Sequence, residues 1–333
     1  MRRILTVLLA MALPAAVSLA AWFAWFISTP LVLATAPLDV SIDSGSSLRS
    51  VSKQLADAGV RFAPWQFTLL ARIKGQATGI KAGSYEIEAG TTPLRLLLQL
   101  TRGDVSQAEF SLIEGWTFRQ VRASLDQHSA LRHDSHNLSE REILARIGAS
   151  EPAAEGLFFP DTYLFGKNTS DLDLLRRSYR AMKSHVDREW DQREPTVPYA
   201  NSYEALIVAS IIEKETGVAA DRPMIAAVFV NRLKGGMPLQ TDPTVIYGLG
   251  AEFDGNLRKG DLTRDTAYNT YTRAGLPPTP IAMPGLASIQ AALRPASSEH
   301  LYFVARGDGS SEFSRTLDEH NRAVTRYQKR RTN

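Results

Sequence analysis

Residues 206–217 read Leu-Ile-Val-Ala-Ser-Ile-Ile-Glu-Lys-Glu-Thr-Gly, an apolar helical run that ends in two carboxylates. On a helical wheel with 3.6 residues per turn, most of the apolar side chains form one broad arc, which we expect to face a core. Glu215 falls within this arc, whereas Glu213 lies on the opposite side, beside the small side chains of Ala209 and Ser210. The sequence therefore predicts a shallow groove with the carboxyl group of Glu213 in its floor.

Both glutamates belong to the last turn of the predicted helix. The partial negative charge at that end of a helix favours the protonated form of a carboxyl group, and a general acid needs that form. The alternative interpretation is that Glu213 only ends a helix on its solvent-facing side. Taken alone, the stretch favours this second interpretation.

The composition bounds the class of protein. With 333 residues, of which 44% are hydrophobic and 22% charged, the chain is long enough for two domains and a sizeable core. The formal net charge is only +3 and the basic residues are spread out, which argues against a nucleic-acid partner. Because cysteine is absent, disulfides, thiolate metal sites and a cysteine nucleophile are excluded.

Residues 1–30 are predicted to hold a cytoplasmic stub and a transmembrane anchor. After Arg2 and Arg3 the chain is uncharged from Ile4 to Ile27, which exceeds the apolar region of a cleaved signal peptide and suffices to span a bilayer. Aromatic residues gather at its far end, as they do at membrane interfaces, and the two arginines place the N-terminus in the cytoplasm. Cleavage near residues 34–36 is the alternative. We expect a single-pass anchor.

A short pattern occurs three times, in residues 42–49, 87–95 and 113–119. Each copy reads as a strand, a tight turn with glycine, a hydroxyl residue able to cap a helix, and a helix. Copies at unequal spacing do not form a solenoid, and they predict small strand–helix units packed as an α+β fold. Further elements are predicted as helices at 65–73, 140–147, 171–192 and 317–327 and as a strand at 301–305.

Three histidines, His128, His133 and His136, lie close together in a polar segment. No carboxylate is placed with them as a metal partner, and the segment has the composition of a surface loop. We therefore expect neither a metal nor another cofactor. A metal-dependent hydrolase remains an alternative, and it would be inactivated by chelators.

Two later stretches, 239–248 and 267–271, are dense in neutral hydrogen-bonding groups. Proteins hold uncharged polar ligands such as carbohydrate with amides, hydroxyls and aromatic faces, and residues 155–165 add aromatic rings beside Asp161 and Thr162. The candidate substrate-binding residues are Gln240, Thr241, Tyr247, Tyr268, Asn269, Thr270 and Tyr271.

The chemistry available is that of carboxylates. The chain contains no phosphate loop, dinucleotide fingerprint, HExxH motif or nucleophile elbow. Carboxylates acting on sugars cleave glycosidic bonds, usually as a pair. A single acid suffices where the substrate supplies its own nucleophile, because one residue then acts as acid and base in turn. Candidates for a second carboxylate are Glu215, Asp161, Asp242, Asp254 and Asp261.

Several strings of this chain strongly resemble the endolytic murein transglycosylase family, also called the YceG-like family. They are residues 209–216, 228–233, 239–248, 267–271 and 275–278, with Glu155-Gly156 and residues 159–162 as a further match. The resemblance runs from the membrane helix to the last helix, and it is specific because contiguous strings match in order.

The resemblance implies an inner-membrane anchor, a small LysM-like βα domain over residues 37–110 and a mixed α+β catalytic domain over residues 111–333 that faces the periplasm. It implies that Glu213 is the catalytic acid and base, which cleaves the bond between N-acetylmuramic acid and N-acetylglucosamine and closes a 1,6-anhydro ring. Glu215 is then interpreted as structural. The implied substrate is nascent peptidoglycan, whose strands the enzyme would terminate, and wall synthases are implied partners.

A non-catalytic glycan-binding scaffold, anchored in the membrane beside the wall-synthesis machinery, is the alternative from another class. It would rest on the LysM-like part and the aromatic loops. Replacing Glu213 separates the two hypotheses, because only the enzyme depends on its carboxyl group.

Overall fold

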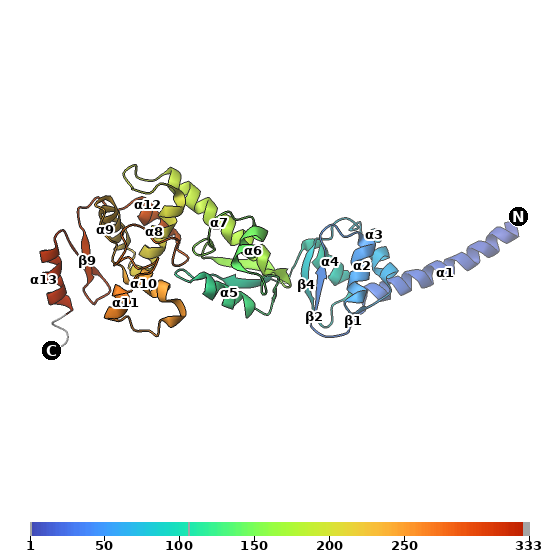
Figure 1. The fold of residues 1–333 in the computed structure, drawn as a ribbon. Coiled ribbons are helices and arrows are strands. Elements are labelled where there is room, and N and C mark those ends of the chain that lie inside the picture. The colour runs from blue at the N-terminus through green and yellow to red at the C-terminus, as the bar shows by residue number, and fades with distance from the viewer. Residues whose placement is uncertain (1, 106, 329–333) are drawn as a thin grey trace. The chain divides into compact units, whose positions relative to one another are not determined.

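The structure, a computed structural model, describes residues 2–105 and 107–328, with residues 2–13 described as backbone only. The chain divides into two compact units (Figure 1), unit 1 with residues 1–109 and 164–169 and unit 2 with residues 110–163 and 170–333. The division falls inside β5 (Gln107–Ser111), β7 (Thr162–Gly166) and β8 (Thr169–Ser170). Both units mix helices with short two-stranded sheets, which confirms the predicted α+β class.

Unit 1 begins with the helix α1 (Arg2–Ser28), which contains Pro14. In the part of the chain whose side chains are described, no helix has the length and apolar character that crossing a bilayer requires. In the transmembrane segment predicted from Ile4 to Ile27, the side chains of residues 4–13 lie outside the part that the structure describes. The other elements of unit 1 are β1 (Val32–Leu33), β2 (Leu38–Ile42), α2 (Leu48–Asp57), β3 (Val60–Arg61), α3 (Pro64–Ile73), β4 (Gly83–Ile87) and α4 (Pro93–Arg102).

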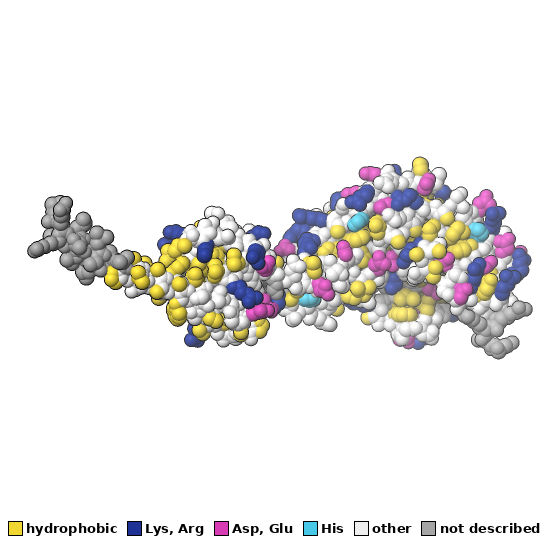
Figure 2. Space-filling view, turned by 180° about the vertical axis from the view of Figure 1, so that it is seen from behind, with side chains coloured by type: hydrophobic (Ala, Val, Ile, Leu, Met, Phe, Trp, Pro, Cys, Tyr) yellow, Lys and Arg dark blue, Asp and Glu magenta, His cyan; other side chains and the backbone are white. Residues whose placement is uncertain are grey.

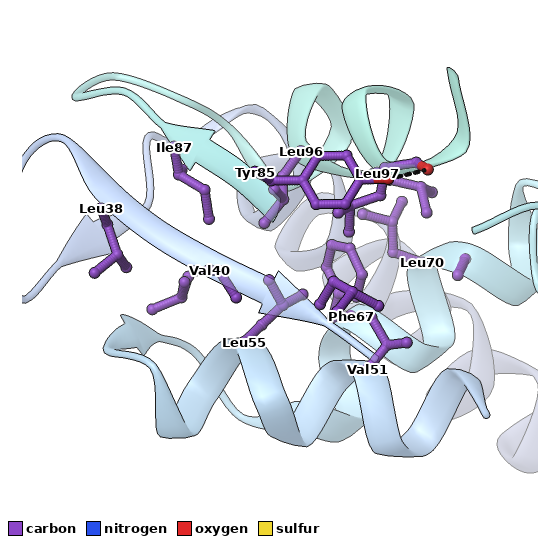
Figure 3. Close-up of a cluster of buried hydrophobic side chains, with 14 of the residues drawn as sticks. Leu38, Val40, Val51, Leu55, Phe67, Leu70, Tyr85, Ile87, Leu96 and Leu97 are labelled. Atoms are coloured by element: carbon purple, nitrogen blue, oxygen red, sulfur yellow. Dashed lines mark hydrogen bonds between the residues drawn. The ribbon is translucent and has the colours of Figure 1, made fainter. Parts of the chain in front are cut away.

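The core of unit 1 is built around β2 and β4, which pair antiparallel with Val40 opposite Tyr85. Every second residue of β2 is buried, as its alternating sequence predicts. Figure 3 shows side chains from α2, α3 and α4 meeting those of the two strands, with Phe67 beside Tyr85. The Tyr85 hydroxyl donates to the carbonyl of Lys81 at 2.7 Å, so the buried ring leaves no polar group unpaired.

The repeated sequence pattern has the predicted local structure in all three copies. The glycines at 45, 90 and 115 have positive φ angles of 78°, 84° and 76°, a conformation that costs glycine little. The hydroxyl groups of Ser47, Thr92 and Thr117 then accept a backbone N–H in the first turn of α2, α4 and α5 (Phe118–Asp126). Turn and cap are both encoded locally, which is why the pattern could be recognised without a template.

Unit 2 is mostly helical. After α5 its elements are β6 (Leu131–Arg132), α6 (Glu140–Ile147), α7 (Asp171–Asp191), α8 (Ser202–Glu215), α9 (Arg222–Lys234), α10 (Asp242–Leu249), a 3-10 turn η1 (Gly250–Glu252), α11 (Lys259–Thr263), α12 (Leu286–Leu293), β9 (Tyr302–Ala305), β10 (Ser311–Ser314) and α13 (Leu317–Tyr327). The elements predicted at 65–73, 140–147, 171–192, 301–305 and 317–327 are all confirmed, with bounds that differ by at most one residue.

Helix α8, which holds the apolar run and both glutamates, is the centre of unit 2. It packs against α7, α9, α10 and α12 (Figure 1), and every residue from Ala205 to Ile212 is buried. The prediction of a shallow groove beside Ala209 and Ser210 is therefore wrong. Small side chains there let another chain segment, residues 281–288, approach the helix closely. The helix becomes partly exposed only at its two ends, at residues 202–204 and in the last turn, which holds both glutamates.

Candidate active site

The carboxyl group of Glu213 is held by the start of α12. Its Oε2 accepts the backbone N–H of Gly285 at 3.0 Å and the hydroxyl of Ser288 at 2.7 Å. It thus lies between the C-terminal end of α8 and the N-terminal end of α12, whose dipoles act on it in opposite senses. In the described residues no donor reaches Oε1, so one oxygen is fixed and the other remains available.

One turn earlier, Ser210 secures the same segment. Its hydroxyl accepts the backbone N–H of Ile281 at 3.0 Å and donates to the carbonyl of Ile207 at 2.7 Å. Ser210 and Glu213 therefore lie on one side of α8 and both bind the segment that leads into α12. This arrangement sets the position of the Glu213 carboxyl relative to the backbone around Gly285.

Glu215 points to the other side of the helix, as the helical wheel predicts. It accepts a hydrogen bond from the hydroxyl of Thr241, just before α10. Part of the residue reaches solvent, but its carboxyl group is desolvated, and this burial raises the pKa of Glu215 to about 7 despite the bond from Thr241. Two glutamates in one turn thus have different partners and different solvation.

Sequence reasoning missed a third carboxyl group, that of Glu155. It is only 5% exposed, accepts the N–H of Phe118 at the start of α5 with both oxygens, at 3.0 and 3.1 Å, and accepts the Tyr247 hydroxyl at 3.1 Å. Burial raises the pKa of Glu155 to about 7, with these hydrogen bonds acting against the rise. The sequence signals were its place beside an aromatic run and the Glu155-Gly156 string that resembles the YceG-like family, and neither distinguishes a buried carboxyl from an exposed one.

A cleft of about 610 Å³ opens beside this end of α8. Its wall combines aromatic rings with a few charged groups, and Tyr247 and Tyr268 meet edge to face with their centroids 4.9 Å apart. A second cleft of about 590 Å³ shares Arg119, Glu155, Tyr247 and Tyr268 with it. The first is lined by Thr117, Arg119, Glu155, Lys214, Pro243, Ile246, Tyr247, Gly250, Phe253, Tyr268 and Ile281.

Glu213 is flanked by this lining rather than included in it. Lys214, its neighbour in sequence, lines the cleft and donates from Nζ to the carbonyl of Gly115 at 3.2 Å. A Cβ placed on Gly115 would lie 3.9 Å from Cγ of Glu213. Glu213 is therefore placed at the margin of the cleft, beside the lining residue Lys214.

The structure places the predicted binding residues in two groups. Tyr247 and Tyr268 line the clefts, and the hydroxyl of Tyr268 is 2.9 Å from that of Thr279. The side chains of the other five are engaged elsewhere. Thr241, Asn269 and Thr270 are buried, Gln240 is exposed with its Oε1 accepting from Arg232, and Tyr271 donates to Asp242 at 2.6 Å.

Asn269 illustrates how these internal bonds shape the loop. Its Nδ2 donates to the carbonyls of Asp261, Leu262 and Arg264, and its Oδ1 accepts the N–H of Tyr271. The amide thereby ties two loop segments together next to Tyr268. Thr270 likewise joins the backbone of Thr241, which binds Glu215. These polar groups hold the wall that presents the tyrosines.

The histidine segment does not gather ligands in the structure. His136 has Asp126 at 3.2 Å, and the ring of His128 lies edge-on to Phe110. Throughout residues 2–105 and 107–328, no three histidine, aspartate or glutamate side chains are grouped so that they could hold a metal ion.

Comparison with known proteins identifies the family of this chain. The family described as "YceG-like family" matches residues 40–326, most of the chain. The chain belongs to the YceG-like family. The resemblance found from the sequence motifs is thereby confirmed.

Two relatives of this YceG-like chain are named for an enzymatic activity. A protein of Bacillus subtilis (strain 168) named endolytic murein transglycosylase is 34% identical over 315 residues, covering 87% of this chain and 84% of the relative. A protein of the same name from Streptococcus pneumoniae serotype 2 (strain D39) is 26% identical and covers 86% of this chain and 58% of its own length. The crystal structure of a yceG-like protein, lmo1499 of Listeria monocytogenes, matches with a TM-score of 0.55 and 31% identity, over 86% of this chain and 98% of that one.

Proposed function

We propose that this YceG-like protein is a lytic transglycosylase that cuts within nascent peptidoglycan strands and so ends their elongation. The observation that carries the proposal is the Glu213 carboxyl group, with Oε2 fixed by Gly285 and Ser288 and Oε1 available at the margin of an aromatic-lined cleft. The family membership and the names of the relatives support the substrate class.

In the proposed mechanism Glu213 acts twice. Protonated, it gives its proton to the glycosidic oxygen between N-acetylmuramic acid and N-acetylglucosamine as the bond from that oxygen to C1 breaks. As a carboxylate, it then takes the proton of the C6 hydroxyl of the same muramoyl unit while that oxygen bonds to C1. The product ends in a 1,6-anhydro ring, and Glu213 regains its starting state. Because the nucleophile belongs to the substrate, no water has to be positioned.

The aromatic faces of Tyr247 and Tyr268 are proposed to contact the sugars. Their hydroxyls are already bonded to Glu155 and next to Thr279, so the rings are held in place before substrate binds. Gln240, Thr241, Asn269, Thr270 and Tyr271 are proposed to act by holding this wall. Glu215 is proposed to be structural.

We also propose where in the cell the protein lies and what unit 1 does. The uncharged run from Ile4 to Ile27 would anchor the chain in the inner membrane with the bulk in the periplasm, and wall synthases would be neighbours there. Unit 1, in which β2 and β4 pair antiparallel and the chain between them forms α2 and α3, would be a LysM-like domain that binds glycan. Release of the protein from membranes by high salt or alkali alone would contradict the anchor.

The decisive experiment determines the product. The purified full chain is incubated with uncrosslinked glycan strands, and the new ends are weighed by mass spectrometry. We expect anhydro ends, lighter by one water than hydrolysed ends. Hydrolysed ends would make the protein a hydrolase. Glu213→Gln should abolish cleavage and keep glycan binding, whereas unchanged product formation would remove Glu213 from its role.

A further inference from the structure

A second carboxylate, that of Glu114, stands next to the proposed catalytic group. It sits in a tight turn in which the N–H of Trp116 donates to the carbonyl of Ile113 at 3.3 Å and Gly115 takes a positive φ of 76°. Two backbone bonds tie this turn to the segment before α12. Gly115 donates to the carbonyl of Met283 at 2.8 Å, and Met283 donates to the carbonyl of Trp116 at 2.7 Å. The backbone at Glu114 is therefore held in place.

The carboxyl group of Glu114 lies on Gly285, the residue that binds Glu213. A Cβ built on Gly285 would stand only 1.9 Å from Oε1 of Glu114 and 2.4 Å from its Cδ. The N–H of the same glycine donates to Oε2 of Glu213 at 3.0 Å. With ordinary bond lengths, the two carboxyl groups are therefore within roughly 8 Å of each other.

Nothing in the described chain gives Glu114 a structural task. The side chain is exposed, and in residues 2–105 and 107–328 no hydrogen bond or ion pair engages its carboxylate. The neighbouring helix α5 is capped by Thr117 and Gln120 instead. The glycine at 285 is not needed for its backbone conformation either, because φ and ψ of −76° and 168° are open to any residue. Its missing Cβ makes room for the Glu114 carboxylate.

We propose that Glu114 is a second catalytic carboxylate, which faces the same sugar as Glu213 and stabilises the positive charge that develops at C1 as the glycosidic bond breaks. The inference rests on the proposed function. Glu114 transfers no proton and forms no bond in this role, so the proton balance of the Glu213 mechanism is unchanged. Glycosidases commonly place two carboxylates about 5–9.5 Å apart around the reacting bond, and a fixed charge aimed at developing charge acts in the transition state rather than in substrate binding.

The first arm of the test replaces the charge. Glu114→Gln keeps the size of the side chain and removes the negative charge, so we expect kcat for glycan cleavage to fall about 30-fold with KM within about twofold of the wild type. Glu114→Asp should recover part of the loss. Thermal unfolding should be unchanged, since the carboxylate holds nothing. A kcat for Glu114→Gln within twofold of the wild type would overturn the proposal.

The second arm moves the carboxylate without changing its chemistry. In Gly285→Ala the backbone is unstrained, and the new methyl group takes the place of Oε1 of Glu114, the end of a flexible side chain. We expect a loss of kcat similar to that of Glu114→Gln. In a Glu114→Ala background, Gly285→Ala should cost little more, because the displaced group is already gone. Fully additive losses would contradict the proposal, since Gly285 would then act on Glu213 alone.

Gly260→Ala is the matched control, because a Cβ on that residue would meet nothing within 4 Å. It should leave kcat unchanged. Product masses from the wild type report on the proposed function, whereas the ratios of rates report on Glu114 whatever the chemistry of the cut. The two proposals can therefore fail separately.

Discussion

The two sides of the last turn of α8 carry the same side chain in different surroundings. On one side, Glu213 binds the N–H of Gly285 and the hydroxyl of Ser288 through one oxygen, at the margin of a cleft. On the other, Glu215 is desolvated, bonded to Thr241, and has its pKa raised to about 7. A carboxyl group is useful in acid–base chemistry only where substrate can reach it. The difference therefore teaches that proximity in sequence says little about role.

The surface of unit 2 agrees with an uncharged glycan as the ligand. On the face shown in Figure 2, basic and acidic side chains are interspersed over unit 2 and do not form a stripe of one sign. Within the cleft, charge is confined to a few groups, Arg119, Lys214 and the buried Glu155 among them. Recognition by ring faces and neutral groups is what such a wall can offer.

The largest expected effect separates the two glutamates by activity. Glu213→Gln should lower kcat by about 10³-fold or more, because an amide cannot give or take the proton. Glu215→Gln should leave kcat within about threefold. Both amides can still accept the hydrogen bonds that the carboxyl groups accept now, so both proteins should fold. Cleavage rates on the same glycan strands measure the contrast, and equal losses at the two positions would break it.

The directions of the two glutamates could be predicted because the helical period fixes them. The glycine turns and caps of the repeated pattern could be predicted for a similar reason, since turn and cap are local. The segment that packs against the small side chains of Ala209 and Ser210 could not be predicted. They allow close approach equally to water, to substrate or to another segment, and only the tertiary fold brings residues 281–288 there.

The candidate site was predictable in part. Neutral polar loops indicated a sugar site, and Tyr247 and Tyr268 do line the clefts. The hydroxyls and amide of Thr241, Thr270 and Asn269 are used inside the protein instead, and composition does not reveal whether a polar group is bonded internally. Glu155 and Glu114 escaped notice because their surroundings come from distant parts of the chain, Tyr247 for the first and Gly285 for the second.

A smaller effect concerns the pH dependence of stability on the Glu215 side. The pKa of Glu215 is about 7 in the fold against an ordinary value of 4.5, so between these values the folded state holds a proton that the unfolded state releases. Its contribution to stability is then fully present below about pH 4.5 and is lost as the pH rises through 7, by on the order of 3 kcal/mol. Glu155, with its pKa also at about 7, acts in the same sense.

Glu215→Gln should therefore flatten the fall in the free energy of unfolding between pH 5 and 8, and at pH 8 it should stabilise the protein. Denaturant unfolding of the full chain at a series of pH values measures this slope. The exposed Glu194→Gln is the matched control and should leave the slope as it is. A slope unaltered by Glu215→Gln would show that its carboxyl group is solvated in the fold, which would remove the difference between the two sides.

The smallest expected effects come from the donors that hold the two carboxyl groups. Ser288→Ala removes one of the two donors to Oε2 of Glu213 and leaves the N–H of Gly285, so the carboxyl group is held less firmly. Thr241→Val keeps the shape of the side chain and deprives the desolvated Glu215 of its donor. We expect Ser288→Ala to lower kcat about tenfold with little change in KM, and Thr241→Val to cost about 1–3 kcal/mol of stability with kcat within twofold.

Cleavage rates and free energies of unfolding, measured on both variants, test whether Ser288→Ala lowers mainly activity and Thr241→Val mainly stability. If Thr241→Val lowered kcat as much as Ser288→Ala does, the support of Glu215 would matter to the reaction, and Glu215 would have to be counted with the active site rather than with the core.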